Sequence, residues 1–134
     1  MNRYLLDTSA LIDFSKGFAS AREKINQLLQ DGSSLGVCAI NVAEFYSGVL
    51  PGTNTDWDAF IHALEYWPIS RKAAMQAGAW RNAYAREGLV LSTSDTLVAA
   101  VAYERRAILL SDNEKHYPMP KITVQSVRDR DDRS

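Results

Sequence analysis

The chain has 134 residues, a net charge of −1, 46% hydrophobic and 23% charged residues, as expected for one globular domain. The near-neutral charge excludes a polycation that coats nucleic acid, and no apolar run reaches the roughly 20 residues that cross a bilayer. A single cysteine, Cys38, excludes an internal disulfide. With no signal peptide evident at the N-terminus, we expect a cytoplasmic protein in which Cys38 is a small buried hydrophobe.

Short apolar runs alternate with amphipathic stretches along the chain. In chain order we expect a strand at 3–6, helices at 9–15 and 18–30, a strand at 35–40, helices at 41–49 and 56–66, an extended piece at 66–69, helices at 71–87 and 96–106, and strands at 107–110 and 121–124. This alternation predicts one α/β domain over residues 1–127 with a mainly parallel sheet, followed by a polar tail at 128–134. Ligands of such folds bind beyond the carboxyl ends of the strands.

Acidic side chains stand where that edge of the sheet is expected. Asp7 and Asp112 follow predicted strands, Glu44 lies in the first turn of a helix, and Asp95 opens another. Carboxylates about 4 Å apart repel by roughly 4 kcal/mol per pair at an effective dielectric near 20, so a cluster of them favours a bound cation. Mg²⁺ suits such an all-oxygen site, which in turn suits phosphodiester hydrolysis.

Each acid also has a purely structural interpretation. The alternatives are an N-cap at Asp7, capping boxes at Asn41–Glu44 and Ser92–Asp95, and a turn at Asp112. Spacing alone does not decide between these roles and a metal centre.

Four motifs resemble those of PIN domains. They are residues 4–9 (YLLDTS), 41–49 (NVAEFYSGV), 94–100 (SDTLVAA) and 109–117 (LLSDNEKHY). Their order and spacing, over residues 3 to 124, are similar to those of the VapC-like toxins of bacterial toxin–antitoxin pairs. The resemblance implies a three-layer α/β/α PIN fold and an endoribonuclease that hydrolyses RNA through a metal-activated water.

The resemblance also implies which residues form the site. Asp7, Glu44 and Asp95 would hold Mg²⁺, or Mn²⁺ in its place, and Asp112 would join them as a catalytic acid. The family's fourth acid matches Asn113 best, so whether Asp112 or Asn113 fills that position stays open, as does the number of metals. Ser9 would be a helper or simply a hydroxyl in the first turn of its helix.

Partners follow from the same resemblance. We expect RNA as substrate, a VapB-like antitoxin, a homodimer and no membrane. An aromatic face belongs either to the antitoxin groove or to the core or dimer interface: Trp57, Phe60, Leu64 and Trp67. Residues 71–110 carry a net charge of +3, and candidates for phosphate contacts there are Arg71, Lys72, Arg86 and, preferred, Arg81. His62 and His116 are expected to be structural.

Other classes of protein compete with this hypothesis. A receiver or haloacid-dehalogenase-type phosphotransfer domain also has an Asp after its first strand, but the Asp-x-Asp of the dehalogenase type is missing. A catalytically impaired PIN-like domain that binds RNA or a protein without cleavage, and a DNA nuclease, remain alternatives. The sequence identifies neither the RNA, the antitoxin nor the assembly size.

Overall fold

A parallel sheet forms the centre of the molecule. The computed structural model describes residues 2–49 and 55–127. Its five strands follow the order β3-β2-β1-β4-β5, and every neighbouring pair is parallel. The predicted α/β class with a mainly parallel sheet is therefore confirmed.

The elements alternate along the chain as expected. The strands are β1 (Arg3–Leu6), β2 (Ser34–Val37), β3 (Glu65–Tyr66), β4 (Ile108–Leu110) and β5 (Val124–Gln125). The helices are α1 (Thr8–Ser15), α2 (Ala19–Gln30), α3 (Ala39–Ser47), α4 (Thr55–Ala63), α5 (Arg71–Arg86), α6 (Thr93–Arg105) and the 3-10 helix η1 (Glu114–His116). None of the helices described is long and apolar enough to cross a membrane.

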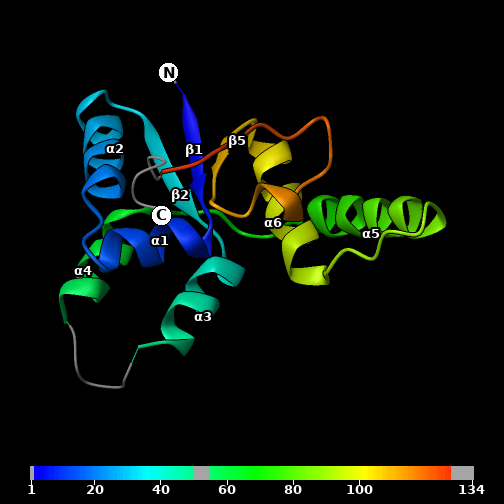
Figure 1. Ribbon diagram of the computed structural model, residues 1–134, viewed down its shortest axis with the longest axis horizontal. Helices are drawn as coiled ribbons and strands as arrows, with labels where there is room; N and C mark the ends of the chain where they lie inside the picture. Colours follow the sequence, from blue (N-terminus) through cyan, green and yellow to red (C-terminus); the bar gives the residue numbers. More distant parts are fainter. Residues whose placement is uncertain (1, 50–54, 128–134) are drawn as a thin grey trace.

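Two apolar cores cover the two faces of the sheet. Successive strand side chains point to opposite faces, so Tyr4 and Leu6 join a core with α1, α2 and α4, whereas Leu5 joins a second core with α6. Figure 1 shows these layers, with α2 on one side of the strands and α6, then α5, on the other. This burial on both faces explains why β1 reads as a continuous apolar run.

Local signals fix the ends of several helices. Ser70 and Ser92 cap α5 and α6, because each hydroxyl accepts a hydrogen bond from a backbone N–H in the first turn. Gly32 and Gly88 follow α2 and α5 with φ of +77° and +85°, the left-handed conformation that glycine adopts without a steric penalty. The two helices end at Gln30 and Arg86, within one residue of the predicted limits at 30 and 87.

The predicted boundary between the second strand and the third helix is wrong. β2 ends at Val37 and α3 already begins at Ala39, so Ile40 is helical. Asn41 therefore is no N-cap paired with Glu44. It occupies the third helical position, and its Oδ1 accepts from the backbone N of Cys38 at 3.1 Å. An apolar run as short as residues 35–40 does not show by periodicity where a strand gives way to a helix.

Smaller boundary errors have similar causes. The predicted helix 56–66 ends at Ala63 instead, because Glu65–Tyr66 pair with β2 as β3. The last strand comprises residues 124–125 rather than 121–124, and α6 begins three residues before the predicted start. Hydrogen bonding to a neighbouring strand sets the limits of β3 and β5, and a single stretch of sequence does not contain that information. The start of α6 is instead set by its N-cap, Ser92. The predicted tail at 128–134 lies outside the described residues.

Candidate metal centre

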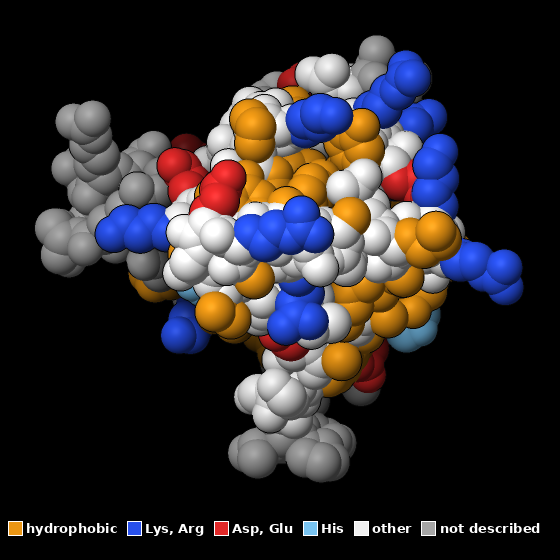
Figure 2. Space-filling model, turned by 90° about the vertical axis from the view of Figure 1, so that its right-hand side faces the viewer, with side chains coloured by type: hydrophobic (Ala, Val, Ile, Leu, Met, Phe, Trp, Pro, Cys, Tyr) orange, Lys and Arg blue, Asp and Glu red, His pale blue; other side chains and the backbone are white. Residues whose placement is uncertain are grey.

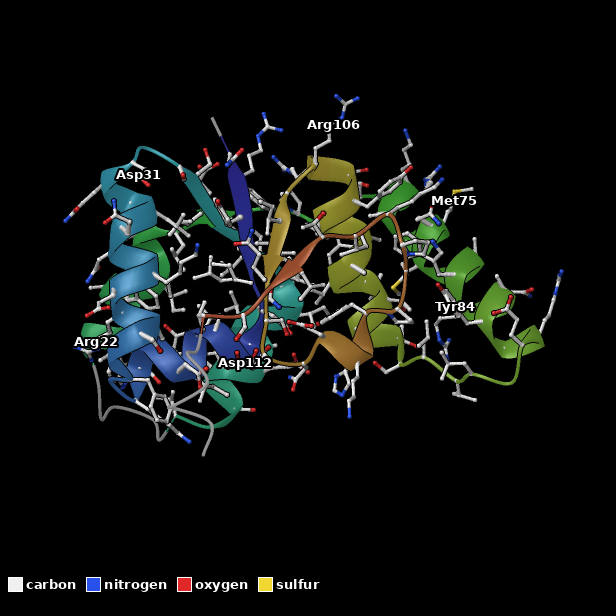
Figure 3. All side chains as sticks on the ribbon, turned by 45° about the horizontal axis from the view of Figure 1, so that its top comes forward. Arg22, Asp31, Met75, Tyr84, Arg106 and Asp112 are labelled. Atoms are coloured by element: carbon white, nitrogen blue, oxygen red, sulfur yellow. The ribbon has the colours of Figure 1, made fainter. Side chains whose placement is uncertain are left out.

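The acidic residues meet at the carboxyl end of the sheet. Asp7 directly follows β1, and its backbone N donates to the carbonyl of Leu110, the last residue of β4, at 2.9 Å. Asp112 follows β4, and Figure 3 shows it at this end of the molecule. Parallel strands bring their carboxyl ends to one edge, which is where ligands of open α/β sheets bind.

Asp7 is the hub of this edge. Its carboxylate is 5% exposed and accepts four hydrogen bonds. Oδ1 accepts from Thr8 N at 2.9 Å and from Asn41 Nδ2 at 3.3 Å. Oδ2 accepts from Ser111 Oγ and from the Tyr117 hydroxyl, both at 2.8 Å. Asp7 is thus the N-cap of α1, as one of the two interpretations predicted, and three further hydrogen bonds fix its carboxylate.

Glu44 and Asp95 face this hub from two helices. Glu44 is exposed on α3, and its Oε1 accepts from Thr8 Oγ1 at 2.7 Å. Asp95 lies in the first turn of α6, where the helix dipole favours a negative charge. Its backbone N donates to Ser92 Oγ, half of the predicted capping box, and its carboxylate lies 3.4 Å from Nδ1 of His116.

All three carboxylates raise the pKa of the Tyr117 phenol. Its pKa is raised well above the usual range, chiefly by burial, then by the charge of Asp7 and the hydrogen bond to it, and finally by the charges of Asp95 and Glu44. The hydroxyl therefore stays protonated and remains a donor to Asp7. Three acids that are distant in sequence thus lie close enough to act on one group.

The donor set fits a hard divalent cation in its chemistry but is not assembled around one. Carboxylate oxygens are the ligands that Mg²⁺ prefers. No lysine or arginine among the described residues forms an ion pair with Asp7, Glu44 or Asp95. Within the same part of the chain, however, no three His, Cys, Asp or Glu side chains are grouped so that they could hold a metal ion. Glu44 is turned to Thr8, and Asp95 is turned to His116.

The fourth position is organised around two serines. The backbone N of Asp112 donates to Ser9 Oγ at 3.0 Å, and that of Asn113 donates to Ser111 Oγ at 3.0 Å. The carboxylate of Asp112 accepts from Ser126 Oγ. Ser9 thus helps to hold the loop after β4, while Asn113 is exposed. This geometry leaves the choice between Asp112 and Asn113 open.

Three contributors to the site were missed by sequence reasoning. Asn41 was interpreted only as a cap, Tyr117 only as the aromatic residue of a motif, and His116 as structural, without an acid nearby. His116 lies 3.4 Å from the carboxylate of Asp95, a neighbour that its spacing in the sequence did not indicate, and its expected structural role stays a prediction. Asn41 is polar and fully buried. Its position three residues before Glu44 was the only sign of its role that the sequence contained.

Other predicted residues lie in the core or on helix surfaces. Leu64 and Trp67 are buried, and Phe60 stacks on Phe14 with ring centroids 4.2 Å apart. Most of the aromatic face is thus packed against the core. Arg81 donates from Nε to the carbonyl of Leu91 at 3.0 Å, which links α5 to the segment before α6.

The buried thiol of Cys38 behaves as expected of a small hydrophobe. Its exposed fraction is zero, and burial raises its pKa. The thiol lies 3.2 Å from Asn41 Oδ1. Cys38 therefore stays protonated and caps α3 rather than supplying a thiolate ligand.

Comparison with known proteins identifies the family. The PIN domain family matches residues 4–122. This chain belongs to the PIN domain family. It is similar to Ribonuclease VapC19 of Mycobacterium tuberculosis, with 25% identity over 115 residues, 86% of this chain and 92% of the relative. It is also similar to Ribonuclease VapC2 of Rickettsia felis, with 24% identity over 129 residues, 92% of this chain and 96% of the relative. The resemblance to VapC proteins predicted from the four motifs is confirmed.

Solved structures share the fold of this PIN domain. VapBC2 from Rickettsia felis, bound to a DNA fragment from their promoter, aligns with a TM-score of 0.77 and 23% identity over 92% of this chain and 98% of that one. DNA-bound VapBC from Salmonella typhimurium aligns with a TM-score of 0.79 and 21% identity over 96% and 100%. The predicted three-layer PIN fold is thereby confirmed.

Proposed function

We propose that this PIN domain is an endoribonuclease and the toxin of a toxin–antitoxin pair. The observation that carries the proposal is the buried, fourfold hydrogen-bonded Asp7 with Glu44 and Asp95 close to it at the carboxyl end of the sheet. Relatives of similar length are named ribonucleases, which supports RNA as the substrate and hydrolysis as the reaction.

In this proposal Asp7, Glu44 and Asp95 hold Mg²⁺ or Mn²⁺. When bound, the cation supplies an acidified water for attack on phosphorus and stabilises charge on the phosphate. The four hydrogen-bond donors fix the orientation of the Asp7 carboxylate. Glu44 would leave Thr8, and Asp95 would leave His116, because both carboxylates need free oxygens to act as ligands. Asp112 is the fourth acid of the proposed site.

A VapB-like antitoxin is the proposed regulator, because the structural neighbours include VapBC complexes. We propose that the antitoxin binds in a hollow of about 540 Å³ between α1, α3 and α4. Glu44 lines this hollow beside apolar side chains that include Ile12, Phe45 and Trp57. A segment of the antitoxin seated there would lie next to a proposed metal ligand. A homodimer in the cytoplasm completes this proposal.

A second candidate is a PIN domain that binds RNA or protein without cleaving it. The side chains described hold no ready-made group of three metal ligands, and Asp112 is hydrogen-bonded to Ser126. In this alternative Asp7 and Asp95 act only at the starts of α1 and α6.

Cleavage of RNA by the antitoxin-free protein separates the two. Total RNA incubated with the wild type and Mg²⁺ should yield discrete fragments, and EDTA should prevent them. Glu44→Gln, which keeps the size of an exposed side chain, should lower the rate by about 100-fold or more, since ligand loss disrupts the site. The matched control is Glu87→Gln, an exposed acid at the far end of α5, which should cleave like the wild type. Intact RNA in all reactions would favour the binding-only alternative, whereas full activity of Glu44→Gln would remove Glu44 from the proposed metal ligands.

A further inference from the structure

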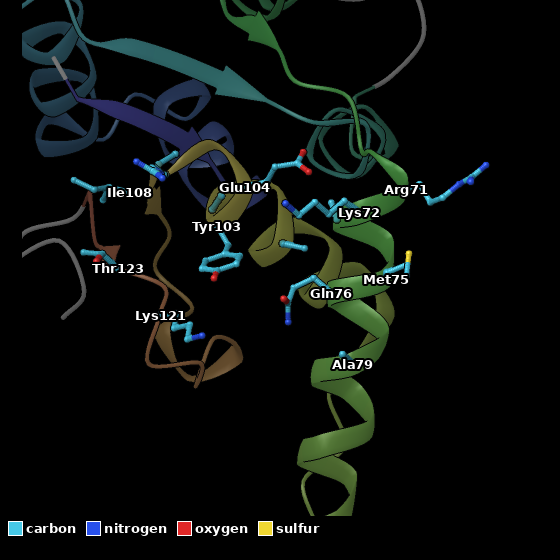
Figure 4. Close-up of a pocket in the computed structure, with 15 residues that line it drawn as sticks. Arg71, Lys72, Met75, Gln76, Ala79, Tyr103, Glu104, Ile108, Lys121 and Thr123 are labelled. Atoms are coloured by element: carbon cyan, nitrogen blue, oxygen red, sulfur yellow. The ribbon is translucent and has the colours of Figure 1, made fainter.

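A groove of about 1000 Å³ lies on a face that the proposed active site does not use. It is formed by the first half of α5, the last turn of α6, the start of β4 and residues 121–123 (Figure 4). Figure 2 shows this side of the molecule, where lysine and arginine side chains surround an apolar hollow. The groove combines two chemistries, a cationic rim and an apolar floor.

The rim carries four cations and one acid. The cations are Arg71, Lys72, Arg106 and Lys121, and the acid is Glu104, so the formal charge of the lining is 4 − 1 = +3. Glu104 accepts a hydrogen bond from Ser70 Oγ at 2.7 Å. In the part of the chain that the structure describes, none of the four cations forms an ion pair. The rim therefore presents positive charge that no ion pair among the described residues neutralises.

The floor is apolar and closely packed. Four of its five alanines are almost fully buried: Ala73, Ala100, Ala102 and Ala107. The fifth, Ala79, is exposed. Met75 stands at the edge with 69% of its surface exposed, and Tyr103 is 40% exposed. Methionine at an exposed surface is typical of sites that accept apolar side chains of a partner. This floor would gain from contact with apolar groups rather than with phosphates.

Arg106 occupies its place on the rim at a conformational cost. It follows α6 with φ of +54°, and the other positive-φ residues described are all glycines: Gly17, Gly32 and Gly88. Glycine is the usual residue at such a helix end, because any Cβ is strained in the left-handed region. An arginine at this position therefore makes the folded state less stable than a glycine would. Its positive charge at the groove is a reason to have arginine there.

The groove is separate from the metal centre. Asp95 lies in the first turn of α6 and Arg106 just beyond its end, 106 − 95 = 11 residues later, or about 16 Å along the helix. A ligand in the groove therefore need not touch Asp7, Glu44 or Asp95. Binding there is measurable without metal or RNA cleavage.

We propose that this groove docks a segment of a partner protein that carries carboxylates beside apolar side chains. Carboxylates match the unpaired cations of the rim, and apolar side chains match the floor. Single-stranded RNA matches less well, because its bases need free aromatic faces. Tyr103 already has Lys121 Nζ 5.9 Å from its ring centroid and packs edge-on against Trp80.

The test measures binding of the full chain to a short fluorescent peptide of leucine, alanine and glutamate, read from the fluorescence anisotropy of the peptide. EDTA is present so that no metal takes part. The comparison ligands are the same peptide with lysine in place of glutamate and a labelled oligouridine. Arg106→Gly is the decisive variant, because it removes the charge and also relieves the left-handed strain. It should melt no lower than the wild type yet bind the acidic peptide about tenfold more weakly. Lys72→Glu should weaken binding likewise, and the matched control Arg86→Ala, on the far end of α5, should not.

The outcomes are distinct. Binding of the acidic peptide alone, lost in Arg106→Gly and Lys72→Glu but kept in Arg86→Ala, supports the proposal. Preference for oligouridine would identify an RNA surface and overturn it. A third outcome is that the peptide does not bind and that the groove variants change only the oligomeric state, measured by sedimentation. This result would show that a second copy covers the groove and would also overturn the proposal. None of these results depends on the nuclease, so the two proposals fail independently.

Discussion

At the scale of single residues, the buried carboxylate of Asp7 depends on its neighbours. A buried charge is costly unless hydrogen bonds replace its lost water. Two hydroxyls, an amide and a backbone N–H do so here, donated by Ser111, Tyr117, Asn41 and Thr8. The same contacts that cap α1 thus hold the central acid of the candidate site. The structural and catalytic interpretations of Asp7 are therefore not exclusive.

Tyr117→Phe tests this dependence. The change removes one hydrogen bond to a buried carboxylate, so we expect a loss of about 1.5–3 kcal/mol in the free energy of unfolding, measured by urea denaturation without metal. Because the pKa of Tyr117 is raised in the folded state, this contribution is complete below about pH 10, the ordinary tyrosine value, and is lost as pH rises above it. Tyr103→Phe, at a more exposed ring, is the control and should change stability by under about 0.5 kcal/mol. Equal losses in the two variants would contradict the role of Tyr117.

At the scale of elements, the packing of β2 against the chain after β3 fixes one edge of the sheet. Trp67 is 2% exposed and lies against Gly36, a residue of β2. A Cβ on Gly36 would come within 2.3 Å of Trp67 Cε2, closer than such atoms approach. The indole therefore requires glycine at this point of the strand. Trp67, which was predicted to belong to the aromatic face, thus packs against β2.

Gly36→Ala should consequently destabilise the protein. The added methyl overpacks a rigid indole, so we expect a loss of about 1–3 kcal/mol, read from urea denaturation curves. Gly78→Ala makes the same chemical change within α5, where nothing lies within 4 Å of the new Cβ. It should stabilise the protein by about 1 kcal/mol, because alanine favours helix. A tolerated Gly36→Ala would mean that Trp67 moves aside easily.

At the scale of the whole molecule, α6 connects the candidate metal centre with the cationic groove. Its N-terminal turn brings Asp95 to the carboxyl end of the sheet, and its C-terminal end forms one wall of the cationic groove. The helix dipole suits both ends, since its positive end meets an acid and its negative end meets Arg105 and Arg106. Negative and positive surfaces are thus separated along one rigid element.

The metal proposal makes a prediction at this scale. Mg²⁺ at about a hundredfold excess over Kd should stabilise the wild type by about 2.7 kcal/mol, visible as a rise in Tm. Asp95→Asn should lose most of this rise, because an amide is a weaker ligand for a hard cation than a carboxylate. Glu87→Gln is again the control and should shift like the wild type. Equal shifts in all three proteins would remove the metal from the proposed site.

The sequence by itself determined the order and type of the elements, the parallel sheet, and the presence of Asp7 and Asp112 at the ends of strands. These features follow from hydrophobic period, glycine and serine signals, and the alternation of strands with helices, all of which act over a few residues. The same local signals placed the start of α3 wrongly, because a short apolar run suits either element.

Only the tertiary structure decided which groups surround the acids. Asn41 and Tyr117 reach Asp7 across 34 and 110 positions of the chain, and His116 at the end of η1 reaches Asp95 in α6. Such pairs depend on strand register and on how helices pack, which no local window contains. The groove beside Arg106 is of the same kind, because its rim comes from two helices and a loop that meet only after the sheet has formed.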